Sequence, residues 1–573
     1  MVSLTKNAKE ILNDRYLLRD DRGIIVETAN QLFKRVAKFV ATTESNNRST
    51  WEERFFQIMN TLDFLPNSPT LMNAGMSSGQ LSACFVLPVN DSMDNIFTTL
   101  KNAALIHQSG GGTGFNFSML RPKNDRVTSS YGTSSGPIAF IKIYDAATEQ
   151  VKQGGKRRGA NMGILNIDHP DIESFITSKS DKNSLQNFNI SVGVTDEFME
   201  AVKNNLNWSL INPRTLEVEK KIKATLLWRN IAEEAWKTGD PGLIFLDTIN
   251  NDNPTPNLGR IEITNPCGEV PLLDYESCNL GSINLSHMVL INKKKFEINW
   301  NKLALTIKIA IRFLDNIISV NYYLLPETKL ITQRNRKIGL GVMGWAEMLI
   351  QLEIPYASLE AVELGNKIME FIKERSYETS AKLAEEKGAF PEWKNSKHYN
   401  NKPLRNATCN SIAPTGTISV IADTSYSIEP LFALAYKRTG ILNGKTQMEI
   451  NKLLKNKMKT LGLWNEAIKK TIFKTGSIRG IDTVSDSIKK LFETSLEIPW
   501  KYHLLHQKAF QKHTDNAVSK TINLPELTSV KEIAKIYWTA WEYKLKGITI
   551  YRYGSRDKQV LQKCNYNTLD DCQ

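Results

Sequence analysis

Short apolar runs alternate with helix-patterned segments along most of this chain, and the alternation narrows the choice of fold. Five runs bounded by turn residues are typical of buried strands: 162–167, 190–194, 243–246, 338–344 and 547–553. Segment 224–236 has an apolar helical face followed by Gly239, and the helical pattern over 359–387 follows Ser358, a candidate N-cap. Strands and helices in alternation predict an α/β fold with a largely parallel sheet, open or closed.

The chain is long enough, at 573 residues, for a large core and more than one folding unit. It shows no internal repeat and no low-complexity linker. We therefore expect a helical region over residues 1–55, one large catalytic α/β domain over 56–556, and a flexible polar tail over 557–573.

The composition is that of an ordinary soluble protein, with 41% hydrophobic and 23% charged residues. No stretch approaches the apolar length of a membrane span, and residues 1–18 lack the apolar core of a signal peptide. Six scattered cysteines indicate a reducing compartment. These features predict a cytoplasmic protein with no membrane partner.

The formal net charge of +13 comes largely from dispersed lysines, as in 291–303 and 451–460. Dispersed lysines fit solvated helix faces, whereas a nucleic-acid surface requires charge gathered on one face with interleaved aromatic residues. We therefore expect no direct nucleic-acid binding. A positive field also favours small phosphorylated substrates.

Two glycine-rich segments leave a ligand site and a structural turn as alternatives. SGGGTGFNFS (109–118) precedes an extended run and lacks the acidic partner of a dinucleotide fingerprint, so it fits either a close approach to a ligand or a turn. QGGKRRGANMG (153–163) places Lys156, Arg157 and Arg158 between glycines, where they can fold onto a phosphate or stay solvated.

A third segment, APTGTIS (413–419), follows an apolar run. It offers backbone N–H groups and the hydroxyls of Thr415, Thr417 and Ser419. This composition fits a phosphate cradle at a helix N-terminus, and it also fits a helix cap with no ligand.

Cys267 lies between an amide and a carboxylate in the segment NPCGEV (265–270). If the segment is extended, Asn265, Cys267 and Glu269 point to the same side. Glu269 would raise the pKa of the thiol, which disfavours a thiolate nucleophile but not a sulfur that loses a hydrogen atom. The residues alone leave a buried cysteine in a turn as the alternative.

Nine motifs along the chain, taken together, resemble those of ribonucleotide reductases. In order they are LPNSPTLMNAG (65–75), SACFVLPV (82–89), SGGGTGFNFSMLRP (109–122), QGGKRRGANMGIL (153–165), NPCGEVPLLDYESCNLGSINL (265–285), RKIGLGVMGWAEML (336–349), SIAPTGTIS (411–419), TDNAVSKTINLP (514–525) and GITIYRYGSRDKQVL (547–561). The resemblance is closest to the adenosylcobalamin-dependent class II enzymes. It implies a ten-stranded α/β barrel of two parallel five-stranded halves, with the radical cysteine at the tip of a finger loop through its centre.

The resemblance also implies a role for each residue of the thiol site. Cys267 becomes a thiyl radical, generated with adenosylcobalamin, and takes the 3′ hydrogen of a ribonucleoside di- or triphosphate. Glu269 is the base for the 3′-hydroxyl, and Asn265 hydrogen-bonds the substrate hydroxyls. Cys84 and Cys278 supply two electrons as the 2′-hydroxyl leaves as water, and they end as a disulfide.

Other residues match substrate and effector positions of the family. The substrate-contacting matches are Ser68, Ala83, Cys84, Gly112, Pro266, Gly268 and the phosphate loop Pro414, Thr415, Gly416, Thr417 and Ile418. The effector matches are Asp91, Ser92 and Arg121 at the family's dimer interface, with Lys156, Arg157 and Arg158 in a loop that relays effector identity to base choice. A deoxynucleotide effector and a homodimer are therefore implied.

Departures from the family pattern bear on the subclass. Tyr551 is followed by Arg552, which breaks the pair of adjacent tyrosines that carries the radical from a separate subunit in class I enzymes. There is no convincing glycyl-radical box of class III, and the front of the chain is too short for an ATP-cone. A D-x-H-x-x-G cobalamin motif is absent, which is neutral because class II enzymes do not depend on it. The alternatives are a class I large subunit that needs a metal-radical partner and a catalytically silent nucleotide-binding regulator.

The remaining cysteines and two histidines have separate interpretations. Cys564 and Cys572 match, at wider spacing than usual, a tail pair that reduces the active-site disulfide and is itself reduced by thioredoxin or glutaredoxin. Cys409 is expected in the core or a pocket wall. His503 and His506 are expected on a helix face rather than as metal ligands, and no metal site is predicted.

Overall fold

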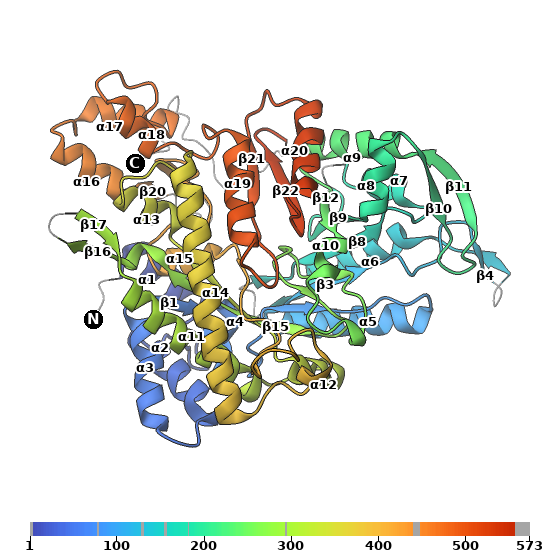
Figure 1. Ribbon diagram of the computed structural model, residues 1–573, viewed down its shortest axis with the longest axis horizontal. Helices are drawn as coiled ribbons and strands as arrows, with labels where there is room; N and C mark the ends of the chain where they lie inside the picture. The colour runs from blue at the N-terminus through green and yellow to red at the C-terminus, as the bar shows by residue number, and fades with distance from the viewer. Residues whose placement is uncertain are drawn as a thin grey trace.

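The computed structural model describes residues 4–76, 79–127, 131–153, 157–181, 183–292, 295–438 and 447–555. Its N-terminal part is a group of four helices, shown in blue in Figure 1: α1 (Lys6–Arg15), α2 (Ala29–Val40), α3 (Arg48–Asn60) and α4 (Ser68–Asn73). Thr28 begins α2 through a reciprocal capping box with Gln31. The domain boundaries expected at residues 55 and 556 stay predictions.

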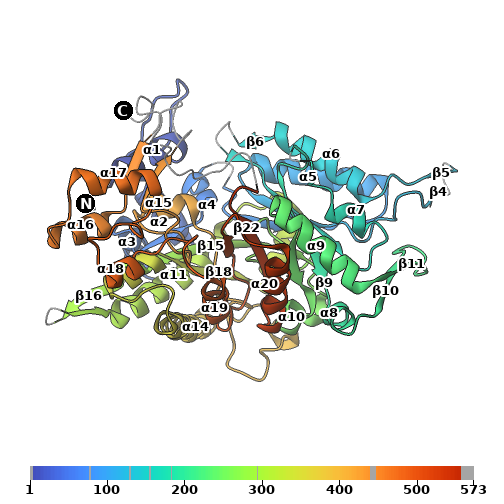
Figure 2. The same ribbon diagram turned by 90° about the horizontal axis from the view of Figure 1, so that it is seen from above.

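Five mutually parallel strands form the first half of a barrel, in the spatial order β2, β3, β8, β9 and β12. Their bounds are β2 (Cys84–Val86), β3 (Gly112–Asn116), β8 (Asn161–Asn166), β9 (Phe188–Val194) and β12 (Gly242–Phe245). The helices that connect them are α5 (Met93–Gln108), α6 (Pro137–Gln150), α7 (Ile172–Ile176), α8 (Asp196–Lys203) and α9 (Ala224–Thr238), and they cover the outer side of these strands (Figure 2). Strands covered by crossover helices are buried on both faces, which explains their apolar runs.

The second half is also parallel, although part of it pairs too briefly to count as strand. β15 (Ser277–Asn284) pairs with β18 (Ile338–Met343), and β21 (Thr521–Leu524) pairs with β22 (Gly547–Arg552). Two single parallel bridges, Leu340 to Asn410 and Ile412 to Val518, join these two pairs through the segment 410–412. The connecting helices are α11 (Trp300–Val320), α12 (Pro326–Asn335), α13 (Trp345–Gln351), α14 (Leu359–Lys387), α15 (Gly416–Ile421), α19 (Trp500–Gln511) and α20 (Val530–Glu542).

Two antiparallel contacts close the ring. β15 pairs with β2, and β12 pairs with β22, so each half meets the other at both edges. β1 (Phe64–Pro66) adds an antiparallel strand to β15 outside the ring. The expected ten-stranded α/β barrel with two parallel halves is confirmed, with 410–412 in the place of a regular strand.

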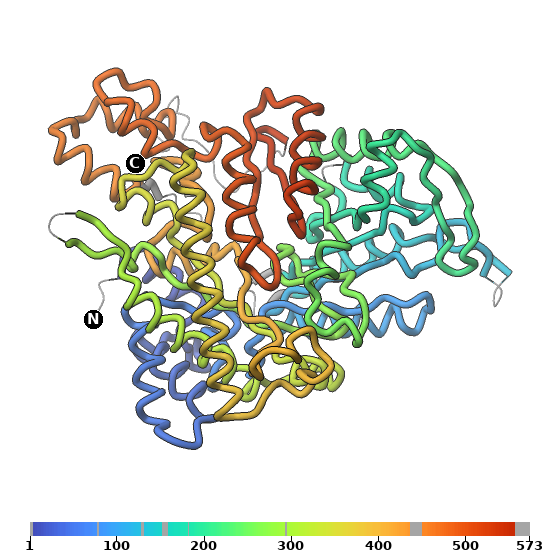
Figure 3. The backbone as a smooth tube through the Cα atoms, viewed as in Figure 1, coloured from blue at the N-terminus to red at the C-terminus, as the bar shows by residue number. Residues whose placement is uncertain are grey.

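The apolar core has two main parts, one for each half. Phe64 and Phe313 meet edge to face at 5.5 Å between the N-terminal helices and the second half, and Phe115 meets Tyr144 at 5.1 Å in the first half. Figure 3 follows the chain from the N-terminal helices to the long helix α14, which packs along α11. Ser358 caps α14 as expected, by accepting a hydrogen bond from Ala361 N.

Smaller elements surround the barrel. They are α10 (Leu246–Asn251), α16 (Lys452–Thr460), α17 (Glu466–Thr475), α18 (Asp486–Leu491) and the strand pairs β4–β5 (126–127 and 132–133), β6–β7 (152–153 and 157–158), β10–β11 (207–211 and 218–223), β16–β17 (289–292 and 295–298) and β19–β20 (435–438 and 447–450). Within the described residues, none of the helices is both long and apolar enough to cross a membrane.

A short hairpin lies inside the barrel. Its strands are β13 (Ile263–Thr264) and β14 (Pro271–Leu272), and its tip is the segment 265–270. On one side a Cβ on Gly114 would lie 1.9 Å from the Thr264 carbonyl oxygen, so β3 needs glycine there. On the other side the Ser411 hydroxyl donates to the Glu269 carbonyl at 2.8 Å. The hairpin therefore contacts both halves and is the expected finger loop.

Candidate active site

The finger loop makes a turn at Cys267 rather than an extended strand. Gly268 has φ +80° and its N–H donates to the Asn265 carbonyl at 3.0 Å. The extended segment considered from the sequence is therefore wrong, because the turn interrupts the i, i+2 alternation. Asn265, Cys267 and Glu269 still line the same cavity, since the turn brings all three to its wall.

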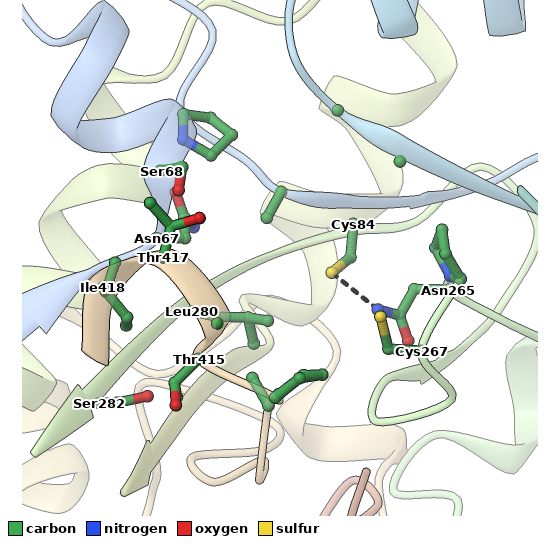
Figure 4. Close-up of a pocket in the computed structure, with 18 of the residues that line it drawn as sticks. Asn67, Ser68, Cys84, Asn265, Cys267, Leu280, Ser282, Thr415, Thr417 and Ile418 are labelled. Carbon is green, nitrogen blue, oxygen red and sulfur yellow. Dashed lines mark hydrogen bonds between the residues drawn. The ribbon is translucent and has the colours of Figure 1, made fainter. Parts of the chain in front are cut away.

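This first cavity has a volume of about 310 Å³ and is bordered by both barrel halves and the N-terminal helices (Figure 4). Its lining includes most of the predicted substrate positions: Ser68, Ala83, Cys84, Gly112, Asn265, Pro266, Cys267, Glu269, Pro414, Thr415, Gly416, Thr417 and Ile418. Gly268 instead lines a neighbouring cavity. Cys278 is fully buried and does not line this cavity.

Asn265 holds the loop tip against the first strand of the barrel. Its Nδ2 donates to Cys84 Sγ at 3.1 Å, shown by the dashed line in Figure 4, and its Oδ1 accepts from Val270 N at 3.0 Å. Burial first, and then the nearby Glu269 carboxylate, raise the pKa of the Cys84 thiol well above its usual range. Cys84 is therefore a thiol, not a thiolate, at neutral pH.

Cys84 and Cys278 lie directly opposite each other on neighbouring antiparallel strands, β2 and β15. Residues opposite each other in such a pair have Cα atoms about 4.5–5.5 Å apart. This spacing falls in the range of about 4.4–6.8 Å that a disulfide spans. Both are reduced thiols in the structure, and burial also raises the pKa of Cys278. The two sulfurs can therefore exchange between dithiol and disulfide with little backbone movement.

Glu269 is a buried carboxylic acid with an uncommitted oxygen. Burial raises its pKa from 4.5 to about 7, although a hydrogen bond with Asn265 acts in the opposite direction. Among the described residues, no hydrogen-bond partner is found for its buried Oε2. A carboxyl group whose pKa lies near neutral pH can both accept and return a proton, which suits a general base.

The segment 413–419 forms a helix start, as the sequence allowed. α15 begins at Gly416, after Thr415 at φ +58°. The hydroxyls of Thr415 and Ser419 share a hydrogen bond of 2.7 Å, and Thr415 Oγ1 also accepts from Ser427 N at 2.8 Å. Those two hydroxyls are therefore committed to the fold. The loop offers a ligand its backbone N–H groups and the half-buried Thr417 hydroxyl.

A second cavity, of about 440 Å³, lies on the other side of the finger loop. It shares Pro266, Cys267 and Pro414 with the first cavity, and much of the rest of its wall comes from β9, β12, β21 and β22. Cys267 is exposed, unlike the other described cysteines. Its thiol thus stands between two separate spaces.

Models of two protein families cover this chain. The all-alpha domain of ribonucleotide reductase matches residues 2–79, and its barrel domain matches 82–403 and 398–551. The chain belongs to the ribonucleotide reductase family. It is 48% identical over 98% of its length to a vitamin B12-dependent ribonucleoside-diphosphate reductase of Thermoplasma acidophilum, of which 80% is covered. Identity is 46% over 98% of the chain to the protein of that name from Mycobacterium tuberculosis, with 81% covered.

A solved structure shares the fold. The alpha subunit of the class Id ribonucleotide reductase of Actinobacillus ureae superposes with a TM-score of 0.78 at 24% identity, covering 96% of this chain and 97% of that one. The resemblance to ribonucleotide reductases drawn from the nine motifs is therefore confirmed. The roles given to single site residues stay predictions.

The residues matched to the reductase effector site are partly described. Arg121 Nε donates to Asp91 Oδ2 at 2.7 Å, and Ser92 caps the N-terminus of α5. Lys156 lies outside the described residues. Arg157 and Arg158 form strand β7 of a short hairpin, and their side chains lie outside the description.

The other cysteine and the two histidines considered from the sequence, Cys409, His503 and His506, are buried. Cys409 is fully buried, as expected. His503 and His506 are both buried on α19, where their Nε2 atoms contact the carbonyls of Ser495 and Tyr356. In the described part of the chain, no cluster of three or more side chains suited to a metal ion is present. The predicted tail pair, Cys564 and Cys572, lies outside the described residues.

Sequence reasoning missed two groups of residues in this reductase. Arg15 and Tyr16, at the end of α1, line the first cavity. Lys520 lines the second cavity, fully buried, in an ion pair with Glu429. A single sequence carries no periodicity or spacing that links such distant residues to Cys267.

Proposed function

We propose that this ribonucleotide reductase converts ribonucleoside diphosphates to 2′-deoxyribonucleotides with adenosylcobalamin as its radical source. The proposal rests mainly on the arrangement of three thiols. The exposed Cys267 lines two cavities, and Cys84 lies opposite Cys278 on neighbouring antiparallel strands. The diphosphate and cobalamin parts of the proposal rest on the relatives from Thermoplasma and Mycobacterium, which are named for both.

Each residue of the site has a step in the proposed reaction. The Cys267 thiyl removes the 3′ hydrogen of the substrate and later returns it. Glu269 takes the proton of the 3′-hydroxyl, which suits its pKa of about 7. Cys84 and Cys278 give two electrons and two protons to the sugar, the 2′-hydroxyl leaves as water, and a disulfide forms between them. Asn265, which already donates to Cys84, orients the substrate hydroxyls.

The second cavity borders Cys267 and offers space there for part of a cofactor. A Cβ on Gly268 would meet no atom within 4 Å, so the loop tip borders open space on this side. Ser191, Ser519 and Asn523 line the cavity and suit the amide groups at the edge of a corrin ring. When bound there, adenosylcobalamin would supply the one-electron oxidation of the Cys267 thiol.

Arg552 stands where class I enzymes have the second tyrosine of the radical relay. Its contacts favour a cofactor as the radical source. Arg552, next to Tyr551, donates from Nε to the Trp236 carbonyl at 2.9 Å and stacks on the Trp236 ring at 4.2 Å. A residue committed in this way does not replace the second tyrosine of a relay.

Regulation and partners follow from the same family. Nucleotide substrates and effectors belong to the large subunit of a ribonucleotide reductase, and we propose a deoxynucleotide effector at Asp91, Ser92 and Arg121. A homodimer is supported by the exposed apolar residues Met93 and Phe97 on the outer face of α5. We further propose a cytoplasmic protein whose tail, with Cys564 and Cys572, passes electrons from thioredoxin or glutaredoxin to the site disulfide.

The test is turnover of the purified chain with cytidine diphosphate and a dithiol, with adenosylcobalamin added or withheld. Deoxycytidine diphosphate is expected only when the cobalamin is present. Activity that needs a second, metal-bearing protein and no cobalamin would assign the chain to class I instead. Tight deoxynucleotide binding without turnover under either condition would identify a regulator.

A further inference from the structure

The first cavity is nearly uncharged for a site that would hold a nucleotide. Among the described residues that line it, Arg15 is the one cation and Glu269 the one carboxylic acid. Glu269 lies beside the thiols, where a negative phosphate would be unfavourable. A nucleoside diphosphate carries several negative charges, so the cation marks the end of the cavity that suits them.

Arg15 enters the cavity at the end away from the thiols. Tyr16, the next residue, is buried and shares a hydrogen bond of 2.7 Å with the Ser68 hydroxyl. Figure 4 shows Ser68 and Thr417 on the left of the cavity and Cys84 and Cys267 on the right. α1 also packs against α15, whose first residues, Gly416 and Thr417, line the same cavity.

A buried ion pair fixes the C-terminal end of α1, which carries Arg15. Glu27 accepts from Leu18 N at 3.1 Å, just after α1, and pairs with Arg35 at 2.8 Å. Arg35 donates in turn to the Ala74 carbonyl at 2.5 Å, at the end of α4. The end of α1 and the helix that carries Ser68 are therefore held as one unit.

The Arg15 guanidinium is available to a ligand. Its recorded polar contact within the described residues is a 3.4 Å approach of Nε to Asp14, and both side chains are about 40% exposed. A pair this long and exposed contributes little free energy. Its planar fork can bind two phosphate oxygens at once.

We propose that Arg15 binds the phosphate groups of the substrate, so that the N-terminal helical region completes the active site. This inference rests on the proposed function, because it assumes that the first cavity holds a nucleotide. The Thr417 hydroxyl, which lines the same cavity, contacts the same phosphates. Arg15 is a binding residue that leaves the chemistry at the sugar unchanged.

The test compares Arg15→Gln with wild type by calorimetric binding of cytidine diphosphate and of cytidine. We expect Arg15→Gln to weaken cytidine diphosphate about tenfold, or ~1.4 kcal/mol, and to leave cytidine unchanged. In turnover, KM should rise by a similar factor with kcat kept, since the contact is the same before and during reaction. Arg15→Lys should lose less, because it keeps the charge.

Arg22→Gln is the matched control, an exposed arginine of the same region outside the cavity lining, and it should bind both ligands like wild type. Wild-type affinity of Arg15→Gln for cytidine diphosphate would overturn the Arg15 assignment alone. Equal loss for cytidine and cytidine diphosphate would also overturn it, because the effect would then be structural. If wild type itself fails to bind cytidine diphosphate, both the assignment and the proposed function fall.

Discussion

Glu269 should make the protein less stable at neutral and higher pH, because burial disfavours the charged form of its carboxyl group. Its pKa in the folded protein is about 7, against 4.5 when exposed. Between these values the folded state holds a proton that the unfolded state has released, so stability falls as pH rises through this window. Raising the pKa from 4.5 to about 7 corresponds to a loss of ~3 kcal/mol in the free energy of unfolding, and this loss is complete above pH 7.

Glu269→Gln removes the charge and should therefore raise the stability of the protein at pH 8 by up to ~3 kcal/mol, with a smaller gain of ~1 kcal/mol at pH 5. The measurement is the midpoint of denaturation of wild type and variant at both pH values. The variant should also lose turnover, since an amide cannot accept the proton of the 3′-hydroxyl. Glu347→Gln is the matched control. It removes another buried carboxyl with a raised pKa, outside the first cavity, and should keep turnover.

The wild-type pH profile is a second reading of the same pKa. Because the base form is needed, kcat/KM should level off above about pH 8, be about half of that level at pH 7 and fall to about a tenth of it at pH 6. A flat profile between pH 6 and 8 would contradict the role of Glu269 as the base. An equal change in stability at pH 5 and pH 8 on going to Gln would contradict the raised pKa.

Two other predictions concern the thiols. The first uses the Cys564→Ala background, in which the tail cannot reduce the site disulfide. When this variant reacts with cytidine diphosphate and adenosylcobalamin without reductant, two thiols should be lost per active site. Cys278→Ser in the same background should lose none by this route and form no deoxynucleotide in steady state, and equal thiol loss in both would exclude the pair with Cys84. Cys564→Ala should lose turnover supported by thioredoxin and keep turnover supported by a small dithiol, and a variant that uses thioredoxin like wild type would contradict the tail role.

Local signals in the sequence were sufficient for many of the elements. α14 begins after Ser358, and α9 ends at Gly239 with φ +81°, because caps are encoded within a few residues. The apolar runs became β8, β9, β12, β18 and β22. The largely parallel sheet was expected because strand-like and helical segments alternate along the chain.

The site depends on contacts that local signals do not carry. Cys84 and Cys278 meet through strand register across about two hundred residues, which the motif resemblance implied but no spacing could show. The turn at Gly268 replaced the extended segment, and the bond between Thr415 and Ser419 removed two expected phosphate-binding hydroxyls. These are tertiary effects, set by how distant segments pack.

The central claim is that Cys267 carries the radical, and formation of deoxycytidine diphosphate by Cys267→Ser tests it most directly. The assay contains cytidine diphosphate, a small dithiol and adenosylcobalamin, with Cys409→Ala, a buried cysteine outside the first cavity, as the control. Wild type and Cys409→Ala should form the deoxynucleotide, and Cys267→Ser should form none while it still binds the substrate. Deoxynucleotide formation by Cys267→Ser would contradict the account.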